Sequence, residues 1–427
     1  MLSTTGTAGP RAASGARRAG IALRHRNFRL FFSGQLISLI GTWMQSLAQG
    51  WLVLQLTQDP FVLGVISAVQ FLPIMVFGLF GGLIADALPK RTTIVATQTA
   101  SMILAFVLFW LTWTHQVQPW HIGVLALLLG CVNTIDMPTR QAFVVEMVGR
   151  EDVVNAVALN SAVFNTARIL GPAIAGVVIG VVGIASCFFL NGVSYIAVII
   201  GLFAMRTSEL HARGGYQFQR SVRAVIADLA EGLRYVRATP VVLLAVGVVG
   251  LVSTLGMNLN VLVPVYAANV LHAGATGFGF LMAATGIGSL VAALTIAFAG
   301  RSSPHVMLVG GAILGLLQAV LVAVHAMPIA LACMFGVGFG SIAMTATANT
   351  SIQLAVPDGL RGRVLSVYTT VFAGSTPIWA LFAGTLAAQF GAALSFGAGG
   401  VTSLAVVVIA FVLARPWLAR EPVRRIA

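Results

Sequence analysis

The sequence predicts an all-α integral membrane protein with twelve transmembrane helices arranged as two pseudo-symmetric six-helix bundles. Composition, the spacing of apolar segments and an internal repeat support this fold class. Of the 427 residues, 58% are hydrophobic and only 8% are charged, whereas soluble domains average about 25% charged residues. Because so few charges cannot cover a surface that faces water, lipid is the expected solvent for most of the chain.

Twelve apolar segments are long enough to cross a bilayer, which takes about 20 helical residues. In the first half they are 31–57, 61–85, 92–114, 120–148, 155–180 and 185–205. In the second half they are 241–268, 277–300, 306–324, 328–355, 364–389 and 392–414. We therefore expect an N-terminal tail at 1–28, a bundle at 29–205, a linker at 206–239, a second bundle at 240–415 and a C-terminal tail at 416–427.

Basic residues predict the orientation of the chain. Arg and Lys occur in the tails and in the even-numbered loops, for example at Lys90, Arg150 and Arg301, whereas the odd-numbered loops contain none. Cytoplasmic loops carry the excess of basic residues, so both termini are predicted to be cytoplasmic, in a bacterial inner membrane. A nucleic-acid partner is not expected, because it requires a clustered basic face on a soluble fold. The first twenty residues lack an apolar stretch and are expected to be a tail, not a cleaved signal peptide.

The linker contains one amphipathic segment. Its apolar residues recur at helical spacing with charged residues between them, and they are Val222, Val225, Ile226, Leu229, Leu233 and Val236. A helix lying on the inner membrane surface is the favoured interpretation. Docking of a soluble partner is the alternative.

The two halves repeat each other. An offset of 208 residues aligns Gly176 with Gly384 and Phe188 with Phe396 without a gap, and an offset of 215 aligns Gly64 with Gly279. Parallel repeats of this kind place two bundles around an axis along the membrane normal. The repeat concerns packing and not chemistry, because the acidic residue at 136 has no acidic counterpart in the second half.

The segment 82–91 reads Gly-Leu-Ile-Ala-Asp-Ala-Leu-Pro-Lys-Arg and resembles the loop signature of the major facilitator superfamily. Gly82, Asp86, Lys90 and Arg91 match the signature, whereas Ala87 and Pro89 depart from it. The resemblance implies a cytoplasmic gate in which Asp86 caps a helix end and pairs with basic residues near helix eleven. Here those would be Arg361 or Arg363, with Glu146 as a further member, and the network would close the cytoplasmic side in the outward-facing state.

The segment 168–176 resembles the antiporter signature of the same superfamily through Gly171, Pro172 and Gly176. Proline removes a backbone donor, and glycine permits a bend and close contact between helices. The segments 136–143 and 27–31 resemble the enterobactin-exporter and macrolide-efflux branch. The resemblance implies the major facilitator fold and a drug:proton antiporter.

Three charged residues lie well within predicted spans: Asp136, Arg140 and Arg168. A charge at the bilayer centre costs about 2.5–3.5 kcal/mol on insertion scales, so it usually faces a partner or a cavity. Asp136 and Arg140 are one helical turn apart and can pair. One hypothesis is that Asp136 carries the coupling proton while the two arginines modulate it. The other is a permanent ion pair that only orders the helices.

Helices one, four, seven and ten line the cavity in the resembled family, and substrate contacts are expected from amides on helices one, seven and ten. The candidates are Gln35, Gln45, Gln49, Asn258, Asn260, Asn349 and Gln353. A hydrogen bond between helices is the alternative role for each. A neutral cavity with positive charge in the first half suits an amphipathic neutral or anionic compound, such as a siderophore.

The sequence therefore predicts a secondary active transporter that exports a small amphipathic compound by alternating access, with protons as coupling ion and the bilayer as surroundings. A lysophospholipid flippase and a membrane sensor without transport are the alternatives. An enzyme is not expected, because no nucleophile–base pair or metal-type spacing is evident, and no phosphate-binding loop is present for ATP. No cofactor is expected, the three cysteines look like small buried residues, and a monomer is predicted.

Overall fold

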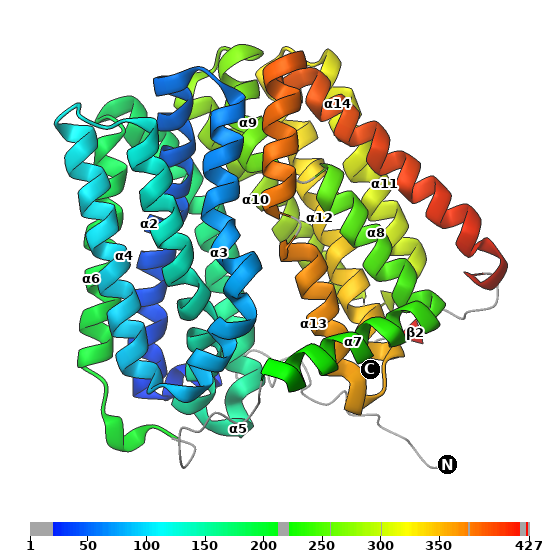
Figure 1. The fold of residues 1–427 in the computed structure, drawn as a ribbon, viewed down its shortest axis with the longest axis horizontal. Helices are drawn as coiled ribbons and strands as arrows, with labels where there is room; N and C mark the ends of the chain where they lie inside the picture. Colours follow the sequence, from blue (N-terminus) through cyan, green and yellow to red (C-terminus); the bar gives the residue numbers. More distant parts are fainter. Residues whose placement is uncertain are drawn as a thin grey trace, which may run out of the picture.

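The computed structural model describes residues 20–211, 222–256, 258–299, 301–374, 376–418 and 424–425. Within them the chain is almost entirely helical, which confirms the predicted all-α fold class. The exception is a two-residue antiparallel ladder between β1 (Arg301–Ser302) and β2 (Arg424–Arg425). The helices form two bundles side by side (Figure 1).

The first bundle contains five long helices: α2 (Arg26–Thr57), α3 (Pro60–Ala87), α4 (Lys90–Trp113), α5 (Pro119–Val181) and α6 (Ala185–Phe203). A short 3-10 helix, η1 (Ile21–Arg24), precedes them, and another, η2 (Thr207–Glu209), follows. The residues of the turn between α2 and α3 explain why α2 ends and α3 begins there. Gln58 adopts a left-handed conformation with φ 52°, and Asp59 caps α3 by accepting a hydrogen bond from the Phe61 amide at 2.8 Å.

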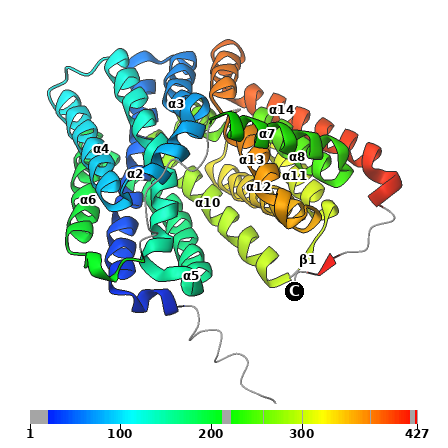
Figure 2. The same cartoon turned by 60° about the horizontal axis from the view of Figure 1, so that its bottom comes forward.

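The second bundle begins after helix α7. It contains α8 (Pro240–Gly256), α9 (Leu259–Asn269), α10 (Gly274–Ala299), α11 (Pro304–Val320), η3 (Leu321–Ala323), α12 (Met327–Ala355), α13 (Asp358–Gly374) and α14 (Thr376–Leu418). Helices α10, α11 and α12 pack side by side, and α14 lies along α11 (Figures 1 and 2).

Nine helical stretches of the described residues are long and apolar enough to cross a membrane. One of them, α5, has 63 residues, about 94 Å at 1.5 Å per residue, whereas the hydrocarbon core is about 30 Å thick. It folds back at Gly149, where φ is 71°, and α14 does the same at Gly391, where φ is 81°. Each of these two helices therefore contains parts of two predicted spans. The total of twelve spans stays a prediction.

Helix α7 (Val222–Ala238) crosses the ends of α13 and α8 at one end of the second bundle (Figure 2). Val236 is buried, and the Tyr235 hydroxyl donates a hydrogen bond to the Ala355 carbonyl at 3.3 Å. Ile226 remains 57% exposed. One part of the amphipathic face thus packs against the bundle while another part is open to the surroundings.

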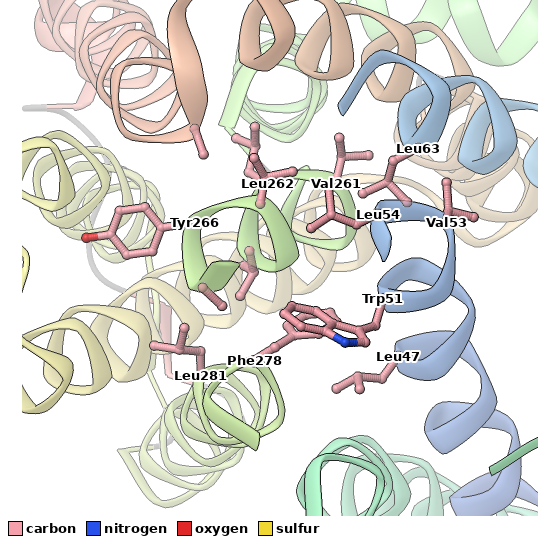
Figure 3. Close-up of a cluster of buried hydrophobic side chains, with 14 of the residues drawn as sticks. Leu47, Trp51, Val53, Leu54, Leu63, Val261, Leu262, Tyr266, Phe278 and Leu281 are labelled. Atoms are coloured by element: carbon pink, nitrogen blue, oxygen red, sulfur yellow. The ribbon is translucent and has the colours of Figure 1, made fainter. Parts of the chain in front are cut away.

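The largest core cluster joins the two bundles at the end opposite α7 (Figure 3). The Trp51 ring of α2 stacks on the Phe278 ring of α10, with centroids 6.2 Å apart. Beside them Tyr266 of α9 is fully buried, and its hydroxyl donates to the carbonyls of Leu321 and Val324. This end of the molecule is closed by contacts between the halves, whereas the helices of the two halves diverge toward the end that carries α7 (Figure 1).

Candidate functional site

At the closed end, the helix backbones of the two halves pack closely at two pairs of glycines. A Cβ built on Gly64 of α3 would lie 3.1 Å from the Gly384 Cα of α14, and one built on Gly176 of α5 would lie 3.2 Å from the Gly279 Cα of α10. The internal repeat relates Gly64 to Gly279 and Gly176 to Gly384. The contact between Gly64 and Gly384 is therefore equivalent to the contact between Gly279 and Gly176. Glycine is needed because any side chain would push the backbones apart.

Two adjoining pockets lie directly below this closure, and both are lined by Ser46 of α2 and Asn260 of α9. The first pocket is mostly polar and also contains Gln49, Ser67, Gln70 and Phe71. The other residues that line the second pocket, called the apolar pocket below, are all apolar: Trp43, Leu47, Pro172, Phe278 and Met282. Residues of both halves therefore line a single region that combines amides, hydroxyls and aromatic rings.

The predicted substrate amides separate into different environments. Gln49 and Asn260 line the pockets, and Gln49 donates a hydrogen bond to Gln70 at 3.1 Å. Gln45 instead accepts a hydrogen bond from Asn191 of α6 at 2.7 Å, inside the first bundle, which is the helix–helix alternative. Gln35 is also buried.

The remaining three amides lie in the second half. Asn258 is the residue before α9 and its backbone carbonyl accepts the first bonds of that helix. On α12, Gln353 donates to Asn349 one turn away, and Gln353 is exposed. Whether any of the seven amides contacts a substrate stays a prediction.

Asp136 lies in a buried cluster of donors between α4 and α5. Its Oδ1 accepts from Thr97 Oγ1 at 2.5 Å and from Gln98 Nε2 at 3.1 Å, and its Oδ2 accepts from Arg140 Nε at 2.5 Å. Asp136 is 4% exposed. The predicted pairing with Arg140 is therefore present in the structure, and both carboxylate oxygens are occupied by donors.

Arg168 is not part of that cluster. Its guanidinium donates to Asn165 Oδ1 at 3.3 Å on its own helix. Among the residues that the structure describes, no carboxylate forms an ion pair with Arg168. In this conformation Asp136 pairs with Arg140 and not with Arg168.

The antiporter-type segment of α5 packs tightly on both sides. A Cβ on Gly171 would lie 2.5 Å from the Trp43 Cβ of α2, and Gly176 contacts α10 as described. Pro172 between them lines the apolar pocket, and its carbonyl oxygen would lie 2.5 Å from a Cβ on Gly279. The segment thus connects the pocket wall to the contact between the halves.

The predicted gate residues of the first half lie at the α7 end. The Lys90 ammonium is 3.8 Å from the Glu146 carboxylate, and both side chains are buried. Arg91 donates to the Leu202 carbonyl at 2.8 Å, at the C-terminus of α6, where the helix dipole favours a cation. A Cβ on Gly82 would meet nothing within 4 Å. The side chain of Asp86 lies outside the described part of the structure.

The predicted gate residue Arg363 of α13 is bound by the linker helix. Its Nε is 2.7 Å from Asp228 Oδ1, and its Nη1 donates a hydrogen bond to Glu231 Oε2 at 2.6 Å. Both acidic residues belong to α7. Arg361, two residues away, is half-buried. In this conformation Arg363 is therefore held on its own half, away from Glu146.

Several residues of these sites were missed by the sequence analysis. Thr97 and Gln98 form a polar pair inside an apolar span, and Gln70 is the one amide of its span, so a search for polar residues within spans could have found them. Ser46, Phe278 and Met282 carry no such signal, because serine, phenylalanine and methionine are common in membrane helices. Among the described residues, no group of three His, Cys, Asp or Glu side chains could hold a metal ion.

Several curated proteins are similar in sequence to nearly the whole chain. One is the staphyloferrin A transporter of Staphylococcus aureus, which is 24% identical over 91% of this chain and 96% of the relative. The multidrug efflux pump Tap of Mycolicibacterium fortuitum is 29% identical over 88% of this chain and 92% of the relative. The enterobactin exporter EntS of Shigella boydii is 22% identical over 90% of this chain and 91% of the relative. These relatives are transporters, so the prediction that the chain is not an enzyme is confirmed.

The fold also matches a solved structure, a bacterial homologue of the human lysosomal transporter Spinster in an inward-facing and occupied conformation. The TM-score is 0.73 at 12% identity, over 92% of this chain and 97% of that one. A family described as transmembrane secretion effectors matches residues 19–423. The predicted resemblance is confirmed, and this chain belongs to the transmembrane secretion effector family of the major facilitator superfamily.

Proposed function

We propose that the protein exports a small amphipathic compound of the siderophore or drug class from the cytoplasm by alternating access. The observation that carries the proposal is the pair of pockets lined by both halves directly below the closed end. A ligand held there would contact Gln49 of one half and Asn260 of the other, so rocking of the halves would expose it to either side. The relatives, whose names include an efflux pump and an exporter, support the outward direction.

The arrangement in the membrane is part of the proposal. Both termini and α7 lie on the cytoplasmic side, residues 29–205 and 240–415 form the two bundles, and residues 206–239 connect them. The basic residues of the even-numbered loops support this orientation. The conformation is then inward-facing, because the contacts at Gly64 and Gly176 close the outer end.

Proton antiport through Asp136 is the proposed coupling. Every polar contact that the structure gives its carboxylate comes from a donor: Thr97, Gln98 and Arg140. A proton bound to Asp136 would point at one of these donors, so proton uptake requires a contact to break. Release of Arg140 would free Oδ2 of Asp136 for the proton while the contacts with Thr97 and Gln98 of α4 remain.

Transport by purified protein in everted proteoliposomes tests the function. We expect the amphipathic dye Hoechst 33342 to accumulate when the vesicle lumen is acidic, with simultaneous release of luminal protons, and to stop accumulating when the pH gradient is dissipated. Liposomes without protein are the control. Movement of a fluorescently labelled lysophosphatidylethanolamine without proton release would instead support the flippase, and absence of flux for both probes would contradict a transporter of amphipathic compounds.

Arg363 is proposed to exchange partners during the cycle. In the inward-facing state it pairs with Asp228 and Glu231 of α7. In the outward-facing state the ends of the two halves meet on the cytoplasmic side, and Arg363 can approach the loop at 82–91 and Glu146 as the loop signature implies. Helix α7 would then stabilise the inward-facing state by holding the arginine on its own half.

Substitution of both acidic residues, Asp228→Asn with Glu231→Gln, is expected to shift the population toward the outward-facing state. The side chains are between 25% and 47% exposed, so the pairs stabilise by about 0.2–1 kcal/mol each and the shift is about two- to thirtyfold. Ser161 is exposed on α5 and is replaced by cysteine. The shift in population is measured as the protection of this cysteine from a thiol reagent added on the cytoplasmic side. Glu209→Gln, which breaks the surface pair with Arg206, is the control, and equal labelling of both variants would contradict the exchange.

A further inference from the structure

Arg168 lies on the face of α5 that leads to the apolar pocket. Phe164, Arg168 and Pro172 follow one another at four-residue intervals, one helical turn each, about 6 Å along the axis. The Phe164 ring makes an edge contact with Trp43, with centroids 5.7 Å apart, and both Trp43 and Pro172 line the pocket. Arg168 therefore lies one helical turn from Pro172, which lines the pocket, and one turn from Phe164, which contacts the pocket residue Trp43.

The positive charge of Arg168 is not neutralised by the described part of the protein. Of the five N–H donors of a guanidinium, the structure occupies one, through Asn165 at 3.3 Å. The buried carboxylate of Asp136 is already paired with Arg140, and the polar residue of the second half at the pocket is the neutral Asn260. An arginine at membrane depth is costly and normally has a partner, and among the described residues no carboxylate pairs with Arg168.

We propose that Arg168 binds an anionic group, a carboxylate, of the exported compound, while the apolar part of that compound occupies the space between Trp43, Phe278 and Met282. The inference rests on the proposed export function and names the chemistry of its substrate. A planar guanidinium binds a carboxylate through two parallel hydrogen bonds. A solute with one carboxylate and an aromatic or aliphatic body fits this arrangement of a cation beside an aromatic wall.

Binding of two probes that differ only in charge tests the inference. Pyrenebutyrate carries a carboxylate, and its methyl ester is neutral. Both are titrated against the full-length protein in neutral detergent, and energy transfer from tryptophan to pyrene reports binding. We expect the wild type to bind the acid about tenfold or more tightly than the ester, because hydrogen bonds to charged groups contribute about 1.5–3 kcal/mol.

Arg168→Gln is expected to abolish this preference, so that the acid and the ester bind with equal affinity, and measurable binding of the ester also shows that the variant is folded. Arg168→Lys should keep part of the preference, because an ammonium retains the charge but not the planar fork. Arg206→Gln, which removes an exposed arginine at the surface, is the control for net charge and should behave as wild type.

A preference for the acid that persists in Arg168→Gln, or a wild type without any preference, would overturn the inference. Transport of Hoechst 33342 by the same Arg168→Gln protein separates this result from the function itself. If dye transport continues while the anion preference is absent from the wild type, the exporter stands and only the role of Arg168 is lost.

Discussion

Replacing Gly279 with alanine is expected to open the closed end of the protein and to lower the transport rate at least tenfold. The added Cβ would lie 2.5 Å from the Pro172 carbonyl oxygen and 3.0 Å from the Gly176 Cα. Both neighbours are backbone and cannot move aside alone, and overpacking of this kind costs about 1–3 kcal/mol. The outer-closed state bears this cost, whereas a state in which α5 and α10 separate does not.

The internal repeat extends the prediction to a second position. Gly64 is equivalent to Gly279, and a Cβ there would lie 2.4 Å from the Ala380 carbonyl oxygen. Gly64→Ala should therefore reproduce the effect on the other side of the molecule. A cysteine at Ser46, which lines both pockets, reports the state through its reaction with an impermeant maleimide added opposite α7, in a background with Cys131→Ser.

A control variant, Gly247→Ala, separates steric crowding between helices from the general effect of alanine within a helix. Alanine favours a helix over glycine by up to about 1 kcal/mol, and a Cβ on Gly247 of α8 would meet nothing within 4 Å. Gly247→Ala should transport normally and keep the cysteine at 46 protected. Normal transport and full protection in Gly279→Ala and Gly64→Ala would show that these contacts do not set the outer gate.

The fold class could be predicted because it depends on features that sequence shows directly. Lipid requires apolar helices, and repeat positions such as Gly176 and Gly384 carry the same packing role in both halves. The turns at Gly149 and Gly391 fall in the predicted breaks between spans, and the first break is marked by the charged residues Arg150, Glu151 and Asp152.

The candidate site could be predicted only in part. Amides in membrane helices signal a polar contact, but not which one: Gln49 and Gln45 are one turn apart on α2, yet Gln49 lines a pocket and Gln45 bonds to Asn191. That difference depends on the neighbouring helices, which lie up to 146 positions away in the chain. The pairing of Arg363 with α7 depends in the same way on the conformational state.

Asp136→Asn is expected to uncouple transport from the pH gradient. The amide cannot take up and release a proton near neutral pH, so gradient-driven accumulation of the dye should fall at least tenfold, while exchange of dye across the membrane without a gradient continues. Asp152→Asn, which removes the carboxylate paired with His25, is the matched control and should remain coupled. Wild-type dependence on the gradient in Asp136→Asn would exclude this residue as the proton carrier.

The single substitution does not by itself distinguish a proton carrier from an ion pair that only orders the helices, and a double variant that includes Arg140 does. Removing the charge of Asp136 leaves Arg140 buried, with a side chain only 14% exposed, and breaking such a pair destabilises by about 3–5 kcal/mol. The double variant Asp136→Asn with Arg140→Gln removes both charges and should recover thermal stability. If the ion pair only orders α4 and α5, the double variant also recovers gradient-driven transport. If Asp136 carries the proton, the double variant is stable and exchanges dye, but a pH gradient no longer drives accumulation.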